Sequence, residues 1–113
     1  MKVIDVYSQY FAGDCVFNEV ARHGAEVKLT ATSDSGHITY EISANFFPHR
    51  DETDYAISYD AYASAVVYDA PGRRSRKREK ALLAELRGHA DALAASLHGT
   101  IFWERPLREA QLA

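Results

Sequence analysis

The stretch EVKLTATSDSGHITYEISANF, residues 26–46, decides the fold class, because apolar and polar side chains alternate on both sides of Ser35-Gly36. Alternation with a period of two is typical of a strand that buries one face. A two-residue turn at Ser35-Gly36 aligns the apolar side chains of the two halves. The predicted inward pairs are Ala31 with Tyr40, Leu29 with Ile42 and Val27 with Ala44. The sequence therefore predicts an antiparallel β-hairpin.

The segment before this hairpin admits two interpretations. In the first, tight turns at Gly13-Asp14 and His23-Gly24 continue the antiparallel meander, and Glu19 lies opposite Lys28 on the outer face. In the second, Asp14 caps a short helix over residues 15–22. The pattern favours strands but leaves the helix open for residues 14–22.

A strand is also predicted downstream, in DETDYAISYDAYASAVVYDA, residues 51–70. The residues of one parity are predicted to face the core: Tyr55, Ile57, Tyr59, Ala61, Ala63, Ala65 and Val67. Tyr62 and Tyr68 have the opposite parity, which places them on the outer face. Because this run is long for one strand, we expect a bulge or bend between Asp60 and Ser64. A helix over the same residues is an alternative that the pattern leaves open.

After the break at Pro71-Gly72, residues 75–98 read as one long helix. Its predicted buried stripe comprises Leu82, Leu86, Ala90, Leu93 and Leu97, widened by Leu83 and Ala94. Gly99 follows at the position of a C-terminal cap. Residues 100–103, TIFW, are predicted to form a short strand that buries Ile101 and Trp103 on one face, and the tail from 106 to 113 is predicted to be loose.

The whole chain is thus predicted to be a single α+β domain, residues 1–113. An antiparallel meander of four to five strands is covered on one face by a single long C-terminal helix, and a short closing strand follows. With 47% hydrophobic and 26% charged residues, the composition is that of a globular protein. Cys15 is the only cysteine and the sequence has no apolar run of membrane-spanning length, so we expect a cytoplasmic protein.

Charge is distributed unevenly along the chain. Residues 1–72 contain four basic and eleven acidic residues, whereas residues 73–113 contain nine basic and five acidic residues. The basic excess is concentrated at the start of the predicted helix, in Arg73, Arg74, Arg76, Lys77, Arg78 and Lys80. Arginines beside helix N–H groups are suited to phosphate, so this cluster is a candidate nucleic-acid or phosphate site. The structural alternative is a solvated helix end that pairs with the acidic half or with a partner.

The acidic half contains a second candidate surface, in which carboxylates lie beside tyrosines. Its members are Asp51, Glu52, Asp54, Asp60, Tyr62, Tyr68 and Asp69. Tyrosine is enriched in interface hot spots, and the carboxylates suit a basic partner. The structural alternative is an ordinary solvent-facing side of a sheet.

Neither a catalytic motif nor a cofactor motif is present. His49 with Asp51, Glu52 and Asp54 could hold a metal, but a solvated acidic loop is the better interpretation, and we expect no metal and no cofactor. The sequence therefore predicts a non-enzymatic binding protein that occupies a macromolecular surface. Its most concrete form is an inhibitor or regulator of a nucleic-acid-handling complex of the phage or mobile-element type, such as an anti-CRISPR.

Two other functions stay open at this stage. One is nucleic-acid or phosphate binding through the basic cluster, and the other is a small enzyme whose site is not visible in the sequence. The expected partner is a protein, such as a nucleic-acid-binding complex, with nucleic acid as the alternative. No membrane partner is expected, and a homodimer is compatible with the sequence.

Overall fold

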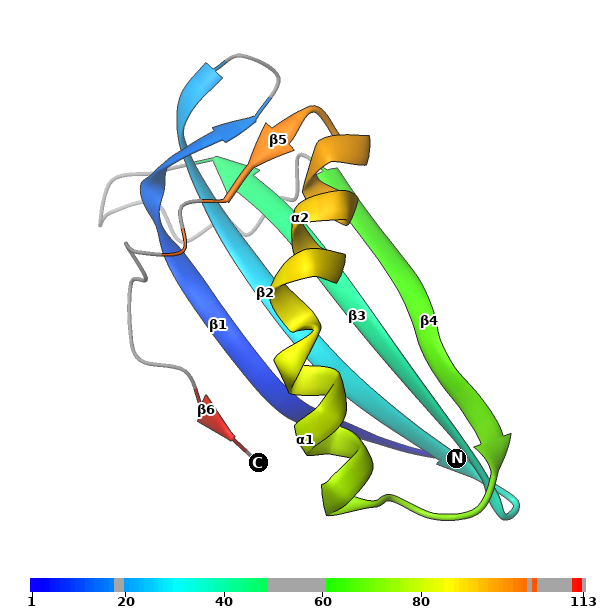
Figure 1. Ribbon diagram of the computed structural model, residues 1–113. Helices are drawn as coiled ribbons and strands as arrows, with labels where there is room; N and C mark the ends of the chain where they lie inside the picture. The colour runs from blue at the N-terminus through cyan, green and yellow to red at the C-terminus, as the bar shows by residue number, and fades with distance from the viewer. Residues whose placement is uncertain (18–19, 49–60, 102, 104–110, 113) are drawn as a thin grey trace.

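A computed structural model describes residues 1–17, 20–48, 61–101, 103 and 111–112. Four long antiparallel strands form a sheet in the order β4-β3-β2-β1, and two helices lie across one face of it (Figure 1). The bounds are β1 Lys2–Phe17, β2 Val20–Asp34, β3 His37–Pro48, β4 Ala61–Pro71, α1 Arg76–Ala84, α2 Leu86–Ser96, β5 Gly99–Thr100 and β6 Gln111–Leu112. The α+β class is confirmed.

The β2–β3 hairpin has the predicted turn and register. Ala31 lies opposite Tyr40, and the other two predicted pairs are also present. Ser35 and Gly36 have φ angles of 51° and 78°, so both turn residues occupy the left-handed region that a two-residue type I′ turn requires. The inward side chains of both strands are almost completely buried in the core.

The two turns predicted before this hairpin are wrong. β1 and β2 run without a turn through Gly13-Asp14 and through His23-Gly24, and Gly24 pairs with Phe47 of β3. The strand interpretation of this region is correct, and the helix over residues 15–22 is absent from its described part. Long strands satisfy backbone N–H and C=O groups that extra turns would have removed from the ladder. β1 follows β2 with register shifts, the largest between Phe11 and Cys15.

β4 contains a bulge, but nearer its end than the sequence predicted. Its register with β3 is regular from Ala61 to Val66, which pairs with Glu41; the next pair is Tyr68 with Tyr40, so Val67 is the extra residue. A bulge reverses the face on which the following side chains lie. The part of the predicted strand before Ala61 lies outside the described residues.

The single long helix is a wrong prediction, because the chain forms two helices with a junction at Glu85. The amide of Glu85 donates to the carbonyl of Leu82, three residues back, at 3.1 Å. This bond tightens the last turn of α1, and Gly88 in the first turn of α2 lowers helix propensity by about 1 kcal/mol relative to alanine. Leu82 and Leu86 remain four residues apart on the buried side, so the apolar stripe passes through the junction unchanged.

The core lies between the sheet and the helices. Leu82, Leu86, Ala90 and Ala94 are buried there against the inward strand residues, and Leu83, Leu93 and Leu97 pack at its margin. After α2, His98 takes the left-handed conformation with φ 59°, a role the sequence had suggested for Gly99. Gly99 is required for another reason, since a Cβ there would lie 2.5 Å from the Phe46 ring.

The last elements return to β1. Gly99–Thr100 pairs with Val16 and Phe17 as β5, which is shorter than the predicted strand over residues 100–103. Gln111 and Leu112, in the tail predicted to be loose, pair with Ser8 and Tyr7 as β6. Residues 106–110 and 113 lie outside the described part of the chain.

Candidate functional site

The basic cluster begins at the N-terminus of α1, where Ser75 is the N-cap. Its hydroxyl accepts a hydrogen bond from the Arg78 amide at 3.2 Å, and its carbonyl accepts one from the Glu79 amide at 2.9 Å. Serine is among the preferred residues for this position because its side chain satisfies an N–H group that lacks a partner within the helix. This cap fixes where α1 starts and therefore where the basic side chains project.

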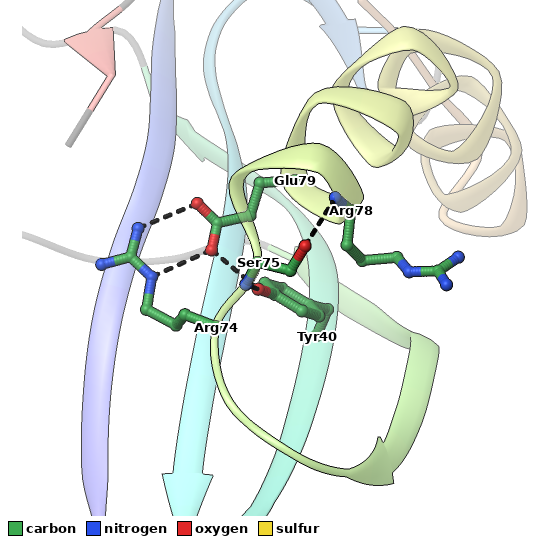
Figure 2. A network of polar contacts seen from close by, with 5 residues as sticks. All are labelled: Tyr40, Arg74, Ser75, Arg78 and Glu79. Carbon is green, nitrogen blue, oxygen red and sulfur yellow. Dashed lines mark hydrogen bonds and ion pairs between the residues drawn. The ribbon is translucent and has the colours of Figure 1, made fainter.

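Glu79, in the first turn of α1, binds Arg74 and Tyr40 in a largely buried network (Figure 2). Arg74 donates from Nε to Oε2 and from Nη2 to Oε1, both at 2.9 Å. The Tyr40 hydroxyl donates to Oε2 at 2.7 Å and accepts from the Ser75 amide at 3.2 Å. These hydrogen bonds therefore hold the start of α1 against β3.

The charges of this network alter the acidity of its members. The hydrogen bonds from Arg74 hold the pKa of the Glu79 carboxyl below its ordinary value, although burial acts in the opposite direction. Burial raises the pKa of the Tyr40 hydroxyl, and the bond to Glu79 raises it further. The carboxylate stays ionised near neutral pH, so part of the basic cluster is neutralised within the domain.

Arg78 is exposed, but it contacts an aromatic ring of the sheet. Its guanidinium carbon lies 4.3 Å from the centre of the Tyr68 ring, in a cation–π contact. Among the described residues, the cluster members that are exposed without a hydrogen bond or ion pair are Arg73, Arg76, Lys77 and Lys80. Two of the six predicted cations, Arg74 and Arg78, thus have a partner within the described part of the domain, and the other four are exposed.

The outward orientation predicted for Tyr68 is wrong. Because the bulge at Val67 reverses the alternation, Tyr68 lies opposite Tyr40, with ring centres 6.0 Å apart, and packs against the core. Tyr62 precedes the bulge and does face outward, with 58% of its surface exposed. Only one of the two tyrosines therefore belongs to the open face of the sheet.

The side of the sheet opposite the helices is called the open face here, because no described helix covers it. Its charged residues are mostly acidic: the register places Asp5 of β1, Glu41 of β3 and Asp69 of β4 there, with Lys28 and the buried Glu26 of β2. Lys28 contacts Asp5 at 3.4 Å and Glu26 at 3.7 Å. These carboxylates raise the pKa of Lys28 although desolvation, the largest single effect, lowers it. Lys28 is thus paired with two acids of β1 and β2. On the β3–β4 side of this face, the acidic residues are Glu41 and Asp69.

Asp69 is the one predicted acidic contact residue that the structure describes. Its carboxylate is in contact with His37 Nε2 and accepts a hydrogen bond from the Thr39 hydroxyl at 3.0 Å. These two hydrogen bonds, His37 first, hold the pKa of Asp69 below its ordinary value. The other predicted acids of this surface, Asp51, Glu52, Asp54 and Asp60, lie outside the described residues.

A small open cavity of about 280 Å³ lies between α2 and the chain that follows it, lined by Arg87, Asp91, Thr100 and Trp103 above Ala94 and Ile101. Ile101 is buried, whereas Trp103 is partly buried and packs edge-on against Phe11, with ring centres 5.1 Å apart. The shared inward face predicted for them is confirmed for Ile101 and holds in part for Trp103. The Trp103 indole N–H donates to Asp91 at 2.7 Å.

The volume of this cavity is at the lower end of the range of ligand sites, about 300–1,000 Å³. Its one carboxylate is already engaged by Trp103. The described residues contain no group of three or more histidine, cysteine or acidic side chains arranged to hold a metal ion. The geometry of the cavity therefore offers no specific reaction.

Two features of the open face and of the Glu79 network were not predicted from the sequence. The open-face acids Asp5 and Glu41 were overlooked, although Glu41 stands at an outward position of the predicted hairpin and could have been found from that register. The pairing of Glu79 with Tyr40 spans thirty-nine positions in the chain, and no local signal indicates it.

Comparison of the chain with protein-family models, with curated proteins and with solved structures finds no match. Within the described residues, no helix has both the length and the apolar character needed to cross a membrane.

Proposed function

We propose that this chain is a non-enzymatic binding protein that acts by occupying a basic macromolecular surface with its open, acidic sheet face. The observation that carries the proposal is the separation of charge across the domain. The open face carries Asp5, Glu41 and Asp69, and the exposed cations of the basic cluster lie at the start of α1, which packs on the opposite face.

Such a face suits a partner whose own binding site is made of lysine and arginine. Asp5 and Asp69 each have a partner within the domain, but they keep 57% and 56% of their side-chain surface exposed, so a basic partner can still reach their carboxylates. Complementary charge speeds encounter and selects the partner, and carboxylates on a flat surface compete with phosphates for the same cations. The most concrete form of the proposal is an inhibitor or regulator of a nucleic-acid-handling complex, of the phage or mobile-element type.

Charge reversal on the open face tests this proposal. The tagged protein is used to capture partners from cells of the organism that encodes it, and nucleic-acid binding by the captured partner is then measured with and without the chain. Glu41→Lys combined with Asp69→Lys should weaken capture on the order of tenfold, since each reversal replaces an attraction by a repulsion.

Glu85→Lys is a control for charge reversal elsewhere on the domain, because Glu85 is exposed at the junction of α1 and α2, and these helices lie on the opposite side of the sheet. It should leave capture unchanged. Capture that survives the reversal of Glu41 and Asp69, or a partner whose nucleic-acid binding the chain does not affect, contradicts the proposal.

A second candidate function is nucleic-acid or phosphate binding through the basic cluster. It is supported by the four exposed cations Arg73, Arg76, Lys77 and Lys80 around the first turns of α1, and weakened by the use of Arg74 and Arg78 within the domain. If all four contact phosphates of double-stranded DNA, the logarithm of affinity should fall with the logarithm of salt concentration with a slope of about −3.6.

Replacing these four residues by alanine should then flatten the salt dependence. The measurement is a DNA-binding titration at several salt concentrations. A wild-type chain that fails to bind DNA at low ionic strength rules this function out.

A further inference from the structure

β4 is the last strand of the sheet on its side, and no strand of the described chain pairs with its outer edge. The opposite edge strand, β1, differs, because β5 and β6 each pair with part of it. A strand edge presents a row of backbone N–H and C=O groups that can pair with another chain. Within the described residues, the outer edge of β4 is therefore unpaired, whereas that of β1 is partly covered.

Natural edge strands are usually protected by charges, prolines or bulges. The segment of β4 from Tyr62 to Val66 has none of these, since the bulge falls at Val67, and Asp69 and Pro71 come later. Tyr62 and Val66 also face outward with 58% and 55% of their surface exposed, and they are two of the four large exposed hydrophobic residues of the described chain. An uncharged edge and exposed apolar side chains thus coincide.

We propose that β4 pairs with β4 of a second copy of this chain, antiparallel, about a two-fold axis at Ser64. This register places Tyr62 of each copy opposite Val66 of the other, and Ser64 opposite Ser64. Ala63 then lies opposite Ala65 on the helix side. Aromatic residues opposite β-branched residues are favourable cross-strand pairs, and this arrangement forms two of them.

The sequence of the segment argues for a second copy over an unrelated strand. A two-fold contact must be complementary to itself, and in this register the two exposed apolar side chains, Tyr62 and Val66, cover each other twice. If the axis moved to Val66, Tyr62 would lie opposite Ala70, beyond the bulge, and the two exposed side chains would no longer meet. The dimer joins two sheets into one, with both acidic faces on the same side.

A pair of double variants tests the register through charge. Tyr62→Lys with Val66→Lys places lysine opposite lysine in the dimer, whereas Tyr62→Lys with Val66→Glu places lysine opposite glutamate. Sedimentation velocity over a concentration series should show a dimer for the wild type and the Lys/Glu variant, and a monomer for the Lys/Lys variant. Both variants change exposed positions, and circular dichroism verifies that each is folded.

Single cysteines test the register independently, in a Cys15→Ser background. Ser64→Cys should form a disulfide between copies under mild oxidation, because residues directly opposite have Cα atoms about 4.5–5.5 Å apart. Tyr62→Cys is the matched control, since the two copies of Tyr62 would lie about 13 Å apart, beyond disulfide reach.

A wild type that is monomeric at every concentration reached overturns the proposal. A dimer that persists in the Lys/Lys variant also overturns it, as does cross-linking of Tyr62→Cys that equals that of Ser64→Cys. A concentration-dependent dimer, lost only in the Lys/Lys variant and cross-linked only through Ser64→Cys, supports it.

Discussion

Replacing Arg74 by alanine should destabilise the fold by about 3 kcal/mol, although Arg74 itself is only partly buried. The Arg74 side chain keeps 34% of its surface exposed, whereas that of Glu79 keeps 8%. Without the guanidinium, the Glu79 carboxylate retains only the Tyr40 hydroxyl among its side-chain partners. Removing one partner of a buried ion pair costs about 3–5 kcal/mol, and the partial exposure of this pair sets the lower end of that range.

The same reasoning predicts a smaller effect for Glu79→Gln. The amide can still bind the Tyr40 hydroxyl, and Arg74 can turn toward water, so we expect a loss of about 1–2 kcal/mol. In the Glu79→Gln background, Arg74→Ala no longer leaves a buried charge without its partner. It should then cost about 1 kcal/mol or less, which corresponds to a coupling of about 2 kcal/mol between the two residues.

Urea denaturation followed by the fluorescence of Trp103, the only tryptophan, measures these differences, with circular dichroism as a second probe. A domain of this size has about 6–17 kcal/mol of stability, so a loss of 3 kcal/mol is well resolved. Lys77→Ala is the control, since Lys77 is exposed on the same helix, and it should change stability by less than about 0.5 kcal/mol. Equal costs of Arg74→Ala in the wild-type and Glu79→Gln backgrounds would show that the two residues are not coupled, contrary to this prediction.

Three further predictions concern the core and the pH dependence of stability. Gly99→Ala should cost about 1–3 kcal/mol in urea denaturation, because the new methyl group would overlap the buried Phe46 ring; an unchanged midpoint would contradict this. Since the folded pKa of Glu79 is lowered, its stabilising effect is complete above the ordinary carboxyl pKa of about 4.3 and is lost as the pH falls through the folded value. Urea midpoints measured from pH 7 to pH 3 should therefore fall less steeply for Glu79→Gln than for the wild type, and parallel curves would be the contrary result. Trp103 should emit at shorter wavelength than in the unfolded chain and be poorly quenched by iodide, whereas a red-shifted, readily quenched emission would exclude its packing against Phe11.

The parts of the fold that follow from local pattern could be predicted from the sequence. The β2–β3 hairpin has its predicted register, because the alternation of apolar residues and the turn at Ser35-Gly36 specify the same pairing. The buried side of the helical region was predicted for the same reason. The junction at Glu85 was not, since Leu82 and Leu86 keep helical spacing across it.

The orientation of Tyr68 could not be predicted, because one extra residue in β4 reverses every side chain after it. The alternation of apolar and polar residues predicts a strand. It does not predict the position of a bulge when the residues on either side of the bulge can be buried in either register. The same is true of the basic cluster. Arg74 pairs with Glu79 and Arg78 contacts Tyr68 because distant elements pack together, so the sequence does not show which charges of the cluster have a partner within the domain.

If the open sheet face occupies a basic, nucleic-acid-binding surface, as we propose, the chain should compete with nucleic acid for its partner in a titration. The captured partner is held at fixed concentration with labelled nucleic acid, and the wild-type chain or the variant with Glu41→Lys and Asp69→Lys is added. The wild type should displace the nucleic acid, with a potency that falls as salt is raised, and the variant should need on the order of ten times more protein. Displacement by the variant at the same concentration as the wild type, or no displacement by either chain, would contradict the claim.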